Sequence, residues 1–443
     1  MTNKGKVYFR SLGCPKNEVD GDTIMGYLRQ AGFQSVDDPR LADYLIINTC
    51  GFIETARQES IEEILRLSLL KNSNGHHKRL LVTGCLAQRY HDDLVKEIPE
   101  IDGMIGIDQY DRINSILTED KVVVAPSPTV YREFAASATH RQRSFAYLKI
   151  ADGCDSGCSY CAIPAIRGRY RSRRLEAIAA DIDRLLEAGV LELNLIAQDV
   201  ARYGFDIGKR PLDLLELIEQ RPEKFWLRPF YLHPVNITDE ILDFLQDSNK
   251  FCNYLEIPIQ HASTKLLQRM NRGYDRDYLE RLLARISGKL PDTVWRTTFI
   301  VGFPGETEGD FKQLCDFIEE HKVCRGGVFT YSREEETAAY DFRPRPRAQT
   351  ANARQEIVQN LINENAERFN LSLVGRRLSM LPETFSTTKG LATGRLYCDA
   401  PEIDFHITVP AQHLDRREFH SVQITATTPE GFVGELIDGG KEC

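Results

Sequence analysis

The feature that most constrains the fold is a repeated order of strand, loop and helix in the first third of the chain. Residues 6–13, 42–49 and 80–84 are mostly apolar and are predicted to be buried strands, and a segment of helical periodicity follows each one. Units of this kind predict a parallel sheet with short crossovers. Ligand sites in such sheets form beyond the carboxyl ends of the strands.

Three cysteines stand at those predicted strand ends, namely Cys14, Cys50 and Cys85. They are far apart in sequence, but neighbouring parallel strands end at one edge of a sheet, so the three thiols can converge there. The alternative is that they are three unrelated loop thiols.

The rest of the chain predicts two further domains. Strands and helices alternate again over residues 145–345, which predicts a full or partial β/α barrel with its functional face at the strand carboxyl ends. From Arg376 onward, short β-like runs are separated by Gly and Pro, which favours a small barrel of the OB type. We therefore predict an α/β protein with an N-terminal domain (1–133), a barrel domain (140–375) and a C-terminal β-barrel (376–443).

Composition limits the classes of function. The chain has 443 residues, a formal net charge of −9, and no apolar run near the roughly 18 residues that a membrane span needs. Its first residues lack the apolar core of a signal peptide, so we expect a cytoplasmic protein without a membrane contact. The acidic balance disfavours a general nucleic-acid binder and leaves a local basic patch open.

A second group of cysteines has metal-ligand spacing. Cys154, Cys158 and Cys161 form a C-x3-C-x2-C loop among glycines, and eleven cysteines without an export signal favour metal ligation over disulfides. Three thiolates on one loop can hold a cubane iron–sulfur cluster and leave one iron open to a ligand. A zinc site is the alternative, with His140 or His233 as its fourth ligand.

With Tyr160 before its last cysteine, this loop resembles the signature of radical S-adenosylmethionine (SAM) enzymes. The chain as a whole resembles the methylthiotransferases, through SLGCPKN at Cys14, NTCGFI at Cys50 and GCLAQ at Cys85. It is most similar to the branch that methylthiolates an aspartate of small-subunit ribosomal protein twelve, through the words ADGCD, CAIP, IAQD, PIQHAS, FIVGFPGET and DAPEID.

The resemblance implies two [4Fe-4S] clusters and SAM as cofactors. It places one cluster on Cys154, Cys158 and Cys161, where SAM would be cleaved to a radical, and a second on Cys14, Cys50 and Cys85, which would carry the transferred sulfur. It implies a TRAM-type C-terminal barrel, an electron donor of the flavodoxin or ferredoxin type, and the β-carbon of an aspartate as the acceptor. The six predicted metal ligands are thus Cys14, Cys50, Cys85, Cys154, Cys158 and Cys161.

Other candidates are predicted to contact SAM, and no residue is assigned as catalytic. The turn at Gly302 and Gly305 could approach the cofactor closely because glycine lacks side-chain bulk, although a plain strand-to-helix turn explains it equally well. Gln198 lies at a predicted strand end, where capping is the alternative. The predicted SAM-binding residues are Tyr160, Gln198, Gly302, Gly305 and Glu306.

The charge of the C-terminal segment bears on the substrate. From Arg376 to Cys443 there are seven Lys/Arg against ten Asp/Glu, and a net acidic module is poorly suited to phosphate neutralisation. This favours a basic ribosomal protein over RNA as the partner. The alternatives are a tRNA adenosine methylthiotransferase and a non-catalytic, metal-bound ribosome adaptor.

Overall fold

The computed structural model describes residues 4–71, 77–119, 121–134, 143–386, 388–411 and 414–437. The chain divides into two compact units. The first unit comprises Met1–Thr139, Lys149–Arg173 and Ser332–Tyr340. The second comprises His140–Leu148, Arg174–Tyr331 and Asp341–Cys443.

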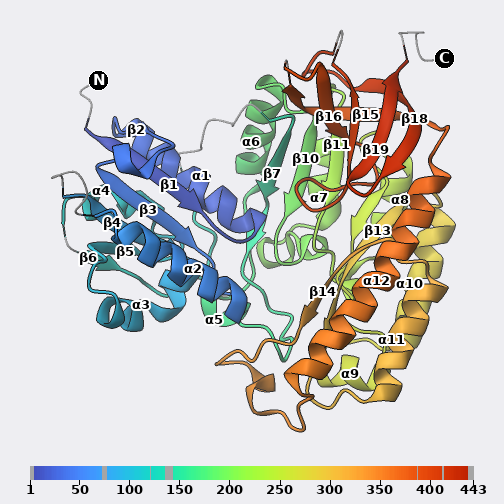
Figure 1. Ribbon diagram of the computed structural model, residues 1–443, viewed down its shortest axis with the longest axis horizontal. Helices are drawn as coiled ribbons and strands as arrows, with labels where there is room; N and C mark the ends of the chain where they lie inside the picture. Colours follow the sequence, from blue (N-terminus) through green and yellow to red (C-terminus); the bar gives the residue numbers. More distant parts are fainter. Residues whose placement is uncertain are drawn as a thin grey trace. The chain divides into compact units, whose positions relative to one another are not determined.

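The first unit is built on a six-stranded parallel sheet in the order β2-β1-β3-β4-β5-β6, with helices on its faces (Figure 1). Its strands are β1 (Lys6–Ser11), β2 (Gln34–Ser35), β3 (Tyr44–Thr49), β4 (Arg79–Gly84), β5 (Gly103–Ile105) and β6 (Lys121–Val123). Its helices are α1 (Pro15–Gln30), α2 (Glu54–Ser68), α3 (Cys85–Glu97), α4 (Ile113–Ile116) and α5 (Ile163–Arg167).

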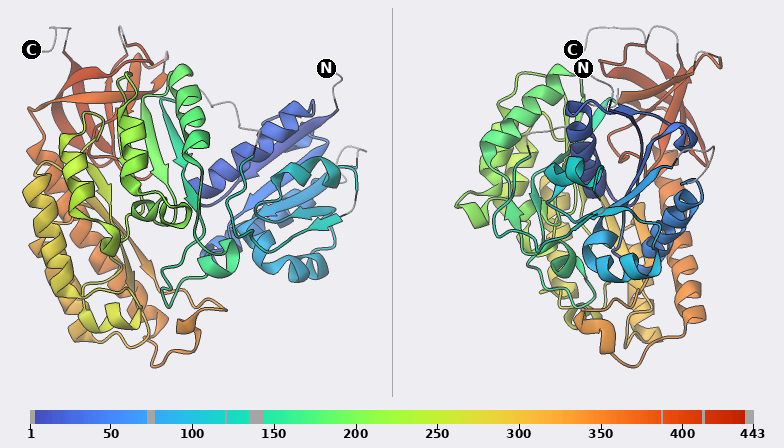
Figure 2. Two further views of the ribbon diagram at one scale, coloured as in Figure 1. Left: turned by 180° about the vertical axis from the view of Figure 1, so that it is seen from behind. Right: turned by 90° about the vertical axis from the view of Figure 1, so that its left-hand side faces the viewer.

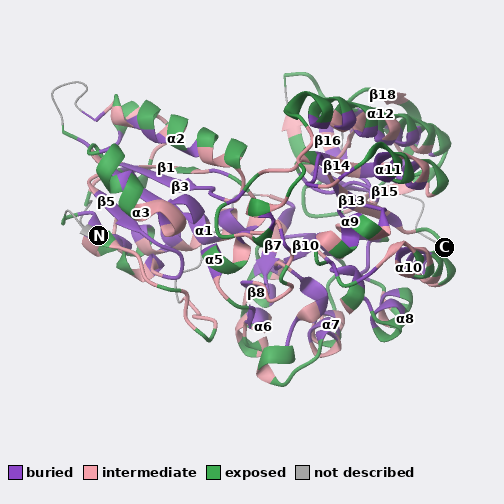
Figure 3. Cartoon of the chain, turned by 90° about the horizontal axis from the view of Figure 1, so that it is seen from below, coloured by how far each residue is buried: buried purple, intermediate pink, exposed green. Residues whose placement is uncertain are grey.

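Helices cover both faces of this sheet, and successive side chains of a strand point to opposite faces, so both sets of side chains are buried. Ile46 and Leu81 pack on one face with apolar residues of α1, α4 and α5, whereas Leu45 and Leu80 pack on the other with residues of α2 and α3. Figure 3 shows the buried strands between helices whose outer surfaces are exposed. Burial on both faces explains why the strands appear in the sequence as continuous apolar runs.

The second unit contains the predicted partial β/α barrel. Two three-stranded sheets, β11-β10-β7 and β12-β13-β14, are linked by a parallel bridge between Leu227 and Phe251. The strands are β7 (Phe145–Lys149), β10 (Glu192–Ile196), β11 (Trp226–Pro229), β12 (Tyr254–Glu256), β13 (Val294–Val301) and β14 (Arg325–Thr330). The helices are α6 (Leu175–Glu187), α7 (Pro211–Glu219), α8 (Asp239–Asp247), α9 (Thr264–Arg269), α10 (Arg276–Lys289), α11 (Glu308–Glu320) and α12 (Ala348–Ser372). A two-stranded ribbon in the first unit, β8 (Ala151–Asp152) with β9 (Arg171–Ser172), frames the C-x3-C-x2-C loop.

The C-terminal segment closes into a five-stranded barrel in the order β15-β16-β17-β19-β18 (Figure 2). Its strands are β15 (Arg377–Ser386), β16 (Leu391–Arg395), β17 (His406–Pro410), β18 (His420–Thr428) and β19 (Gly431–Leu436). The predicted fold class, an N-terminal parallel sheet, a partial β/α barrel and a small C-terminal β-barrel, is therefore confirmed.

Buried ion pairs join the small barrel to the β/α barrel within the second unit. Glu192 of β10 accepts hydrogen bonds from Arg228 of β11 (2.6 Å) and from Arg395 of β16. Arg296 of β13 pairs with Asp404 in the loop before β17. Within the described ranges, no helix is both long and apolar enough to cross a membrane.

Candidate functional site

The structure places Cys14, Cys50 and Cys85 at the carboxyl edge of the first sheet. They follow β1, β3 and β4, which are neighbours in the sheet. Thr49 pairs with Gly84 in the register of β3 and β4, so Cys50 and Cys85 are the next residues on adjacent parallel strands. One edge of the sheet therefore presents all three thiols.

Helix N-termini and tight loops hold these cysteines. Cys14 is the N-cap of α1, and α3 begins at Cys85, so two helix dipoles present their positive ends to thiol groups. The Ser60 hydroxyl accepts a hydrogen bond from the backbone N–H of Cys50 (3.0 Å) and donates one to its carbonyl (2.9 Å). Gly13 lies so close to Cys50 that an added Cβ would come within 2.9 Å of its Sγ.

The environment of the thiols suits a metal cluster. Burial, together with the neighbouring Cys85 and Cys14, raises the pKa of Cys50 to about 12, and burial also raises the pKa of Cys85. A protonated thiol must release its proton to bind a metal as a thiolate, so loading of the site is coupled to proton release. Three converging thiols form a soft donor set of the kind that iron–sulfur clusters use.

The spacing of the thiols bears on the zinc alternative. Sulfur atoms around one tetrahedral zinc ion lie about 3.8 Å apart, because each Zn–S bond is about 2.3 Å long. Among the described residues, the one group of three candidate ligand atoms that all lie within 4.8 Å of one another belongs to Glu280, Glu320 and His321. Arg276 already pairs with both of those glutamates. Neither cysteine trio thus has the close spacing of a tetrahedral zinc site, and His140 lies outside the described residues.

The C-x3-C-x2-C loop belongs to the same unit as the first three cysteines. The backbone N–H of Cys154 donates to the carbonyl of Gly168 (3.1 Å), and that of Cys161 donates to Cys158 (3.1 Å). The Cys154 sulfur accepts a hydrogen bond from the Ser156 backbone (3.4 Å). Tyr160 and all three thiols of the loop are half-buried, so the loop keeps access to small ligands.

A buried charge cluster, which the sequence did not predict, lies beside the cysteines. It consists of Asp20 of α1, Lys149, Asp152 and Arg167 of α5, and each of the four is at most 3% exposed. Burial alone would raise the pKa of Asp152, but Arg167 and Lys149 hold it far below its usual range. In the sequence, Asp20 lies six residues after Cys14 and Asp152 two residues before Cys154, but neither position identifies the partners of these carboxylates.

The remaining candidates lie in the second unit. Gly302 has φ +72°, and an added Cβ would come within 2.5 Å of the Ala351 Cβ, so close packing of α12 alone requires glycine there. The buried Glu306 accepts a hydrogen bond from the Gly302 backbone and lies 3.7 Å from His261 and 3.4 Å from Arg354. An added Cβ at Gly305 would be 3.3 Å from the Arg269 side chain. These contacts describe a rigid strand-to-helix turn.

Gln198 follows β10 and is half-buried beside Asp199. Asp199 accepts hydrogen bonds from the His233 backbone (3.2 Å) and from Asn236, and burial raises its pKa to about 6. His233 is buried against Tyr274, and neither of its ring nitrogens has a hydrogen-bond partner among the described residues. These polar groups follow β10 and β11, at the carboxyl ends where barrel enzymes carry their sites.

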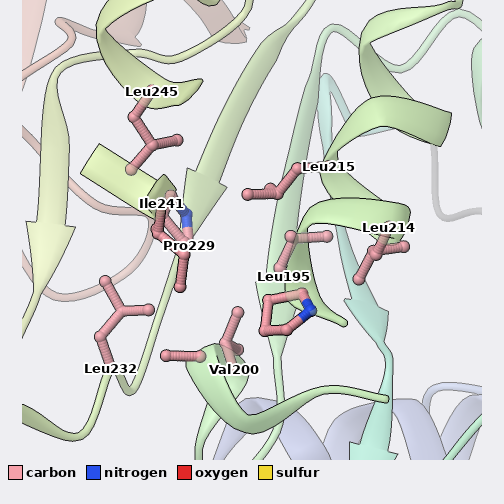
Figure 4. Close-up of a pocket in the computed structure, with 10 residues that line it drawn as sticks. Leu195, Val200, Leu214, Leu215, Pro229, Leu232, Ile241 and Leu245 are labelled. Atoms are coloured by element: carbon pink, nitrogen blue, oxygen red, sulfur yellow. The ribbon is translucent and has the colours of Figure 1, made fainter. Parts of the chain in front are cut away.

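Two of the cavities among the described residues differ in size and lining. A groove of about 700 Å³ in the first unit lies beside α2 and α3, and the Leu86 that lines it follows Cys85 directly. Four acidic and two basic side chains line that groove: Glu54, Asp93, Glu97, Glu335, Arg57 and Arg333. The pocket drawn in Figure 4 holds only about 20 Å³ between apolar side chains such as Leu195 and Leu214, so it is a packing gap in the second unit.

Three family models match successive parts of the chain. Residues 6–106 match the uncharacterized protein family UPF0004, residues 148–318 match the radical SAM superfamily, and residues 374–437 match the TRAM domain. In fold, the chain is similar to the radical SAM methyltransferase TsrM from Kitasatospora setae, whose structure has cobalamin and a [4Fe-4S] cluster bound. The TM-score is 0.56 at 16% identity, over 76% of this chain and 77% of that one.

Curated relatives narrow the class to one family. The chain is 43% identical to the ribosomal protein uS12 methylthiotransferase RimO of Pelotomaculum thermopropionicum, over 98% of this chain and 99% of that protein. It is 40% identical to the proteins of the same name from Clostridioides difficile (98% and 99%) and Caldanaerobacter subterraneus (99% and 99%). The chain therefore belongs to the RimO family of radical SAM methylthiotransferases that act on ribosomal protein uS12.

Proposed function

We propose that this chain adds a methylthio group to the β-carbon of an aspartate of ribosomal protein uS12. The observation that carries the proposal is the presence, in one compact unit, of two separate trios of cysteines. One trio converges at a sheet edge and the other occupies a single loop. Methylthiolation needs a radical generator and a sulfur carrier, and two sites of soft ligands supply a place for each.

The cofactors of the proposal are two [4Fe-4S] clusters and SAM. Cys154, Cys158 and Cys161 would hold one cluster, and the trio at the sheet edge would hold the other. When bound, the loop cluster with SAM supplies the organic radical, and the second cluster supplies a site for sulfur. Two helix N-termini position Cys14 and Cys85. Cys50 and Cys85 are buried, which limits the access of water to a reactive species at this site.

Tyr160, Gln198, Gly302, Gly305 and Glu306 are proposed to form the SAM site. Support comes from their positions: Tyr160 stands next to Cys161, and the others follow strands of the barrel. The backbone of Gly302 fixes the carboxylate of Glu306, so this turn offers a preformed surface rather than a mobile one. No side chain is proposed to act as acid or base.

The partners follow from charge and class. The acidic C-terminal barrel suits a basic ribosomal protein better than RNA, and cluster reduction requires a one-electron donor of the flavodoxin or ferredoxin type. We propose a cytoplasmic location and a division into an N-terminal domain (1–133), a radical SAM barrel (140–375) and a TRAM-like barrel (376–443). The matched family ranges support this division.

The test is a competition between substrates. The anaerobically reconstituted chain is incubated with SAM, a sulfide source and a reductant, together with either uS12 or unmodified tRNA. We expect mass spectrometry to find one added methylthio group on a single aspartate of uS12. Modification of tRNA alone would replace the proposal by an RNA methylthiotransferase, and a colourless protein that carries zinc would favour the adaptor.

A further inference from the structure

Arg167 is the charged side chain whose contacts reach a sulfur of the sheet-edge trio. It ends α5, six residues after Cys161, and α5 packs against α3, which begins at Cys85. Its Nη2 group donates a hydrogen bond to Cys85 Sγ over 3.4 Å. The guanidinium is 1% exposed, so this donor acts in a medium of low dielectric.

The other contacts of Arg167 hold its guanidinium in one orientation. Nη1 donates to Asp152 over 2.8 Å, and Nη2 donates to Asp20 over 3.0 Å. Lys149 binds both carboxylates, at 2.6 Å from Asp20 and 2.5 Å from Asp152. Two carboxylates and two cations balance in charge. Since Nη2 carries two hydrogens and Asp20 takes one, its second hydrogen is directed to the sulfur.

We propose that Arg167 is a positioning residue that sets the reduction potential of the cluster bound by Cys14, Cys50 and Cys85. The inference rests on the proposed function, since it needs that cluster. N–H donors to cluster sulfurs and nearby positive charge stabilise the reduced, more negative state and so raise the potential. A buried guanidinium whose orientation is fixed by two carboxylates provides both effects.

The placement of Arg167 also links the two cysteine sites. Asp152, its partner, stands two residues before Cys154, and the Asp152 side chain accepts a hydrogen bond from the Gly153 backbone (2.8 Å). The same arginine therefore binds a sheet-edge thiol and the start of the loop that carries the other trio. A purely structural ion pair would explain its bonds to the carboxylates but not a change in cluster potential.

The test isolates the sheet-edge cluster in a full-length chain in which Cys154, Cys158 and Cys161 are all replaced by alanine. Arg167→Gln and Arg167→Lys are added to this background. The midpoint potential of the remaining cluster is measured by a redox titration followed by electron paramagnetic resonance. We expect Arg167→Gln to shift the potential to a more negative value, and Arg167→Lys, which keeps the charge but loses the planar fork, to shift it less.

Arg171→Gln is the matched control. Arg171 is equally buried and pairs with Asp108 (2.9 Å), so its loss also removes an ion pair from the first unit. We expect both glutamine variants to lower the melting temperature of the metal-free chain, and only the Arg167 variant to shift the potential. If Arg167→Gln does not retain iron, the midpoint potential of Arg167→Lys is compared with that of the background chain instead.

Two outcomes overturn the proposal and differ in what else they reject. If the background chain retains iron and sulfide but the Arg167 variants titrate at the parent potential, Arg167 is a structural residue and the second cluster stands. If the background chain holds no iron and sulfide, the second cluster fails and this inference fails with it.

Discussion

Gly13 shows how one residue without a side chain brings two cysteine loops together. Its φ of +90° is a conformation that other residues adopt at a cost, and an added Cβ would lie 2.7 Å from the Cβ of Cys50. The approach of the Cys14 and Cys50 loops therefore depends on the missing methyl group.

The first prediction concerns Gly13→Ala. We expect it to destabilise the first unit by about 1–3 kcal/mol, because it adds backbone strain and a steric overlap. We also expect the iron content to fall by roughly the amount of iron that the sheet-edge cluster contributes. Thermal unfolding and iron analysis of the reconstituted chain measure both. Gly288→Ala is the control, since an added Cβ there meets no atom within 4 Å and alanine favours helix α10 by about 1 kcal/mol. Equal iron content in the two variants would contradict the prediction.

The second prediction concerns His233 and pH. Burial, with Arg272 and Arg202 nearby, lowers the pKa of His233 to about 3. Below pH 6.5, the ordinary pKa of histidine, the unfolded chain binds a proton at this residue that the folded chain does not. The free energy of unfolding therefore decreases as the pH is lowered, by up to about 1.4 kcal/mol per pH unit. Asp199, with a pKa raised to about 6, acts in the opposite direction: it favours the fold more as the pH falls through about 6.

The comparison of wild type with His233→Gln separates the two groups, because both chains keep Asp199. We expect the melting temperature of the wild type to decrease more than that of His233→Gln when the pH is lowered from 7 to 5. An equal decrease of the melting temperature in both chains would show that His233 is protonated in the folded chain.

The cysteines and Arg167 differ in how far the sequence could predict their roles. The two groups of cysteines could be predicted as ligand sites because their spacing in the loop and their positions after apolar runs are local patterns. Arg167 was not, because its partners Asp20 and Cys85 lie 147 and 82 residues away. An arginine in a short helix carries no local sign that it will be buried against a thiol.

The third prediction concerns the buried ion pairs that join the strands β10, β11 and β16. Glu192→Gln leaves Arg228 and Arg395 buried without their shared carboxylate, so we expect a loss of about 3–5 kcal/mol in stability. Glu383→Gln is the control, because among the described residues this side chain pairs with Arg395 alone, and it is partly exposed. Thermal unfolding of the two variants measures the difference. Equal losses would mean that the shared carboxylate does not fix the small barrel to β10 and β11.

Apolar periodicity predicted strands well where both faces are buried, as in β3 and β4. It missed β2, β5 and β6, which have two or three residues each and offer too short a pattern. It also left Arg296 without its partner, since Asp404 belongs to another domain and 108 residues separate them. The DAPEID segment is thus explained by structure: Asp399 pairs with Arg325 and Asp404 with Arg296.

At the scale of the molecule, the two cysteine trios share one compact unit, although the loop trio lies in the range that matches the radical SAM superfamily. Sequence order assigned the trios to different domains. The structure groups Lys149–Arg173 with the N-terminal sheet through buried contacts, such as those of Ile166 with the core of that sheet. One compact unit therefore holds both trios, and each trio has its own three thiols.

The fourth prediction follows from the separate ligands of the two trios. Cys158→Ala should lower the iron content by about half and abolish the formation of 5′-deoxyadenosine, because only the loop trio is proposed to bind SAM at an open iron. Cys50→Ala should lose a similar amount of iron, keep deoxyadenosine formation, and yield uS12 without a methylthio group. Liquid chromatography of the nucleoside and mass spectrometry of uS12 report the two activities separately. Cys252→Ala is the control, a buried cysteine outside both trios that should preserve both activities. Methylthiolated uS12 from the Cys50 variant would show that sulfur reaches the aspartate without the sheet-edge site, and the division of labour between the two trios would then be wrong.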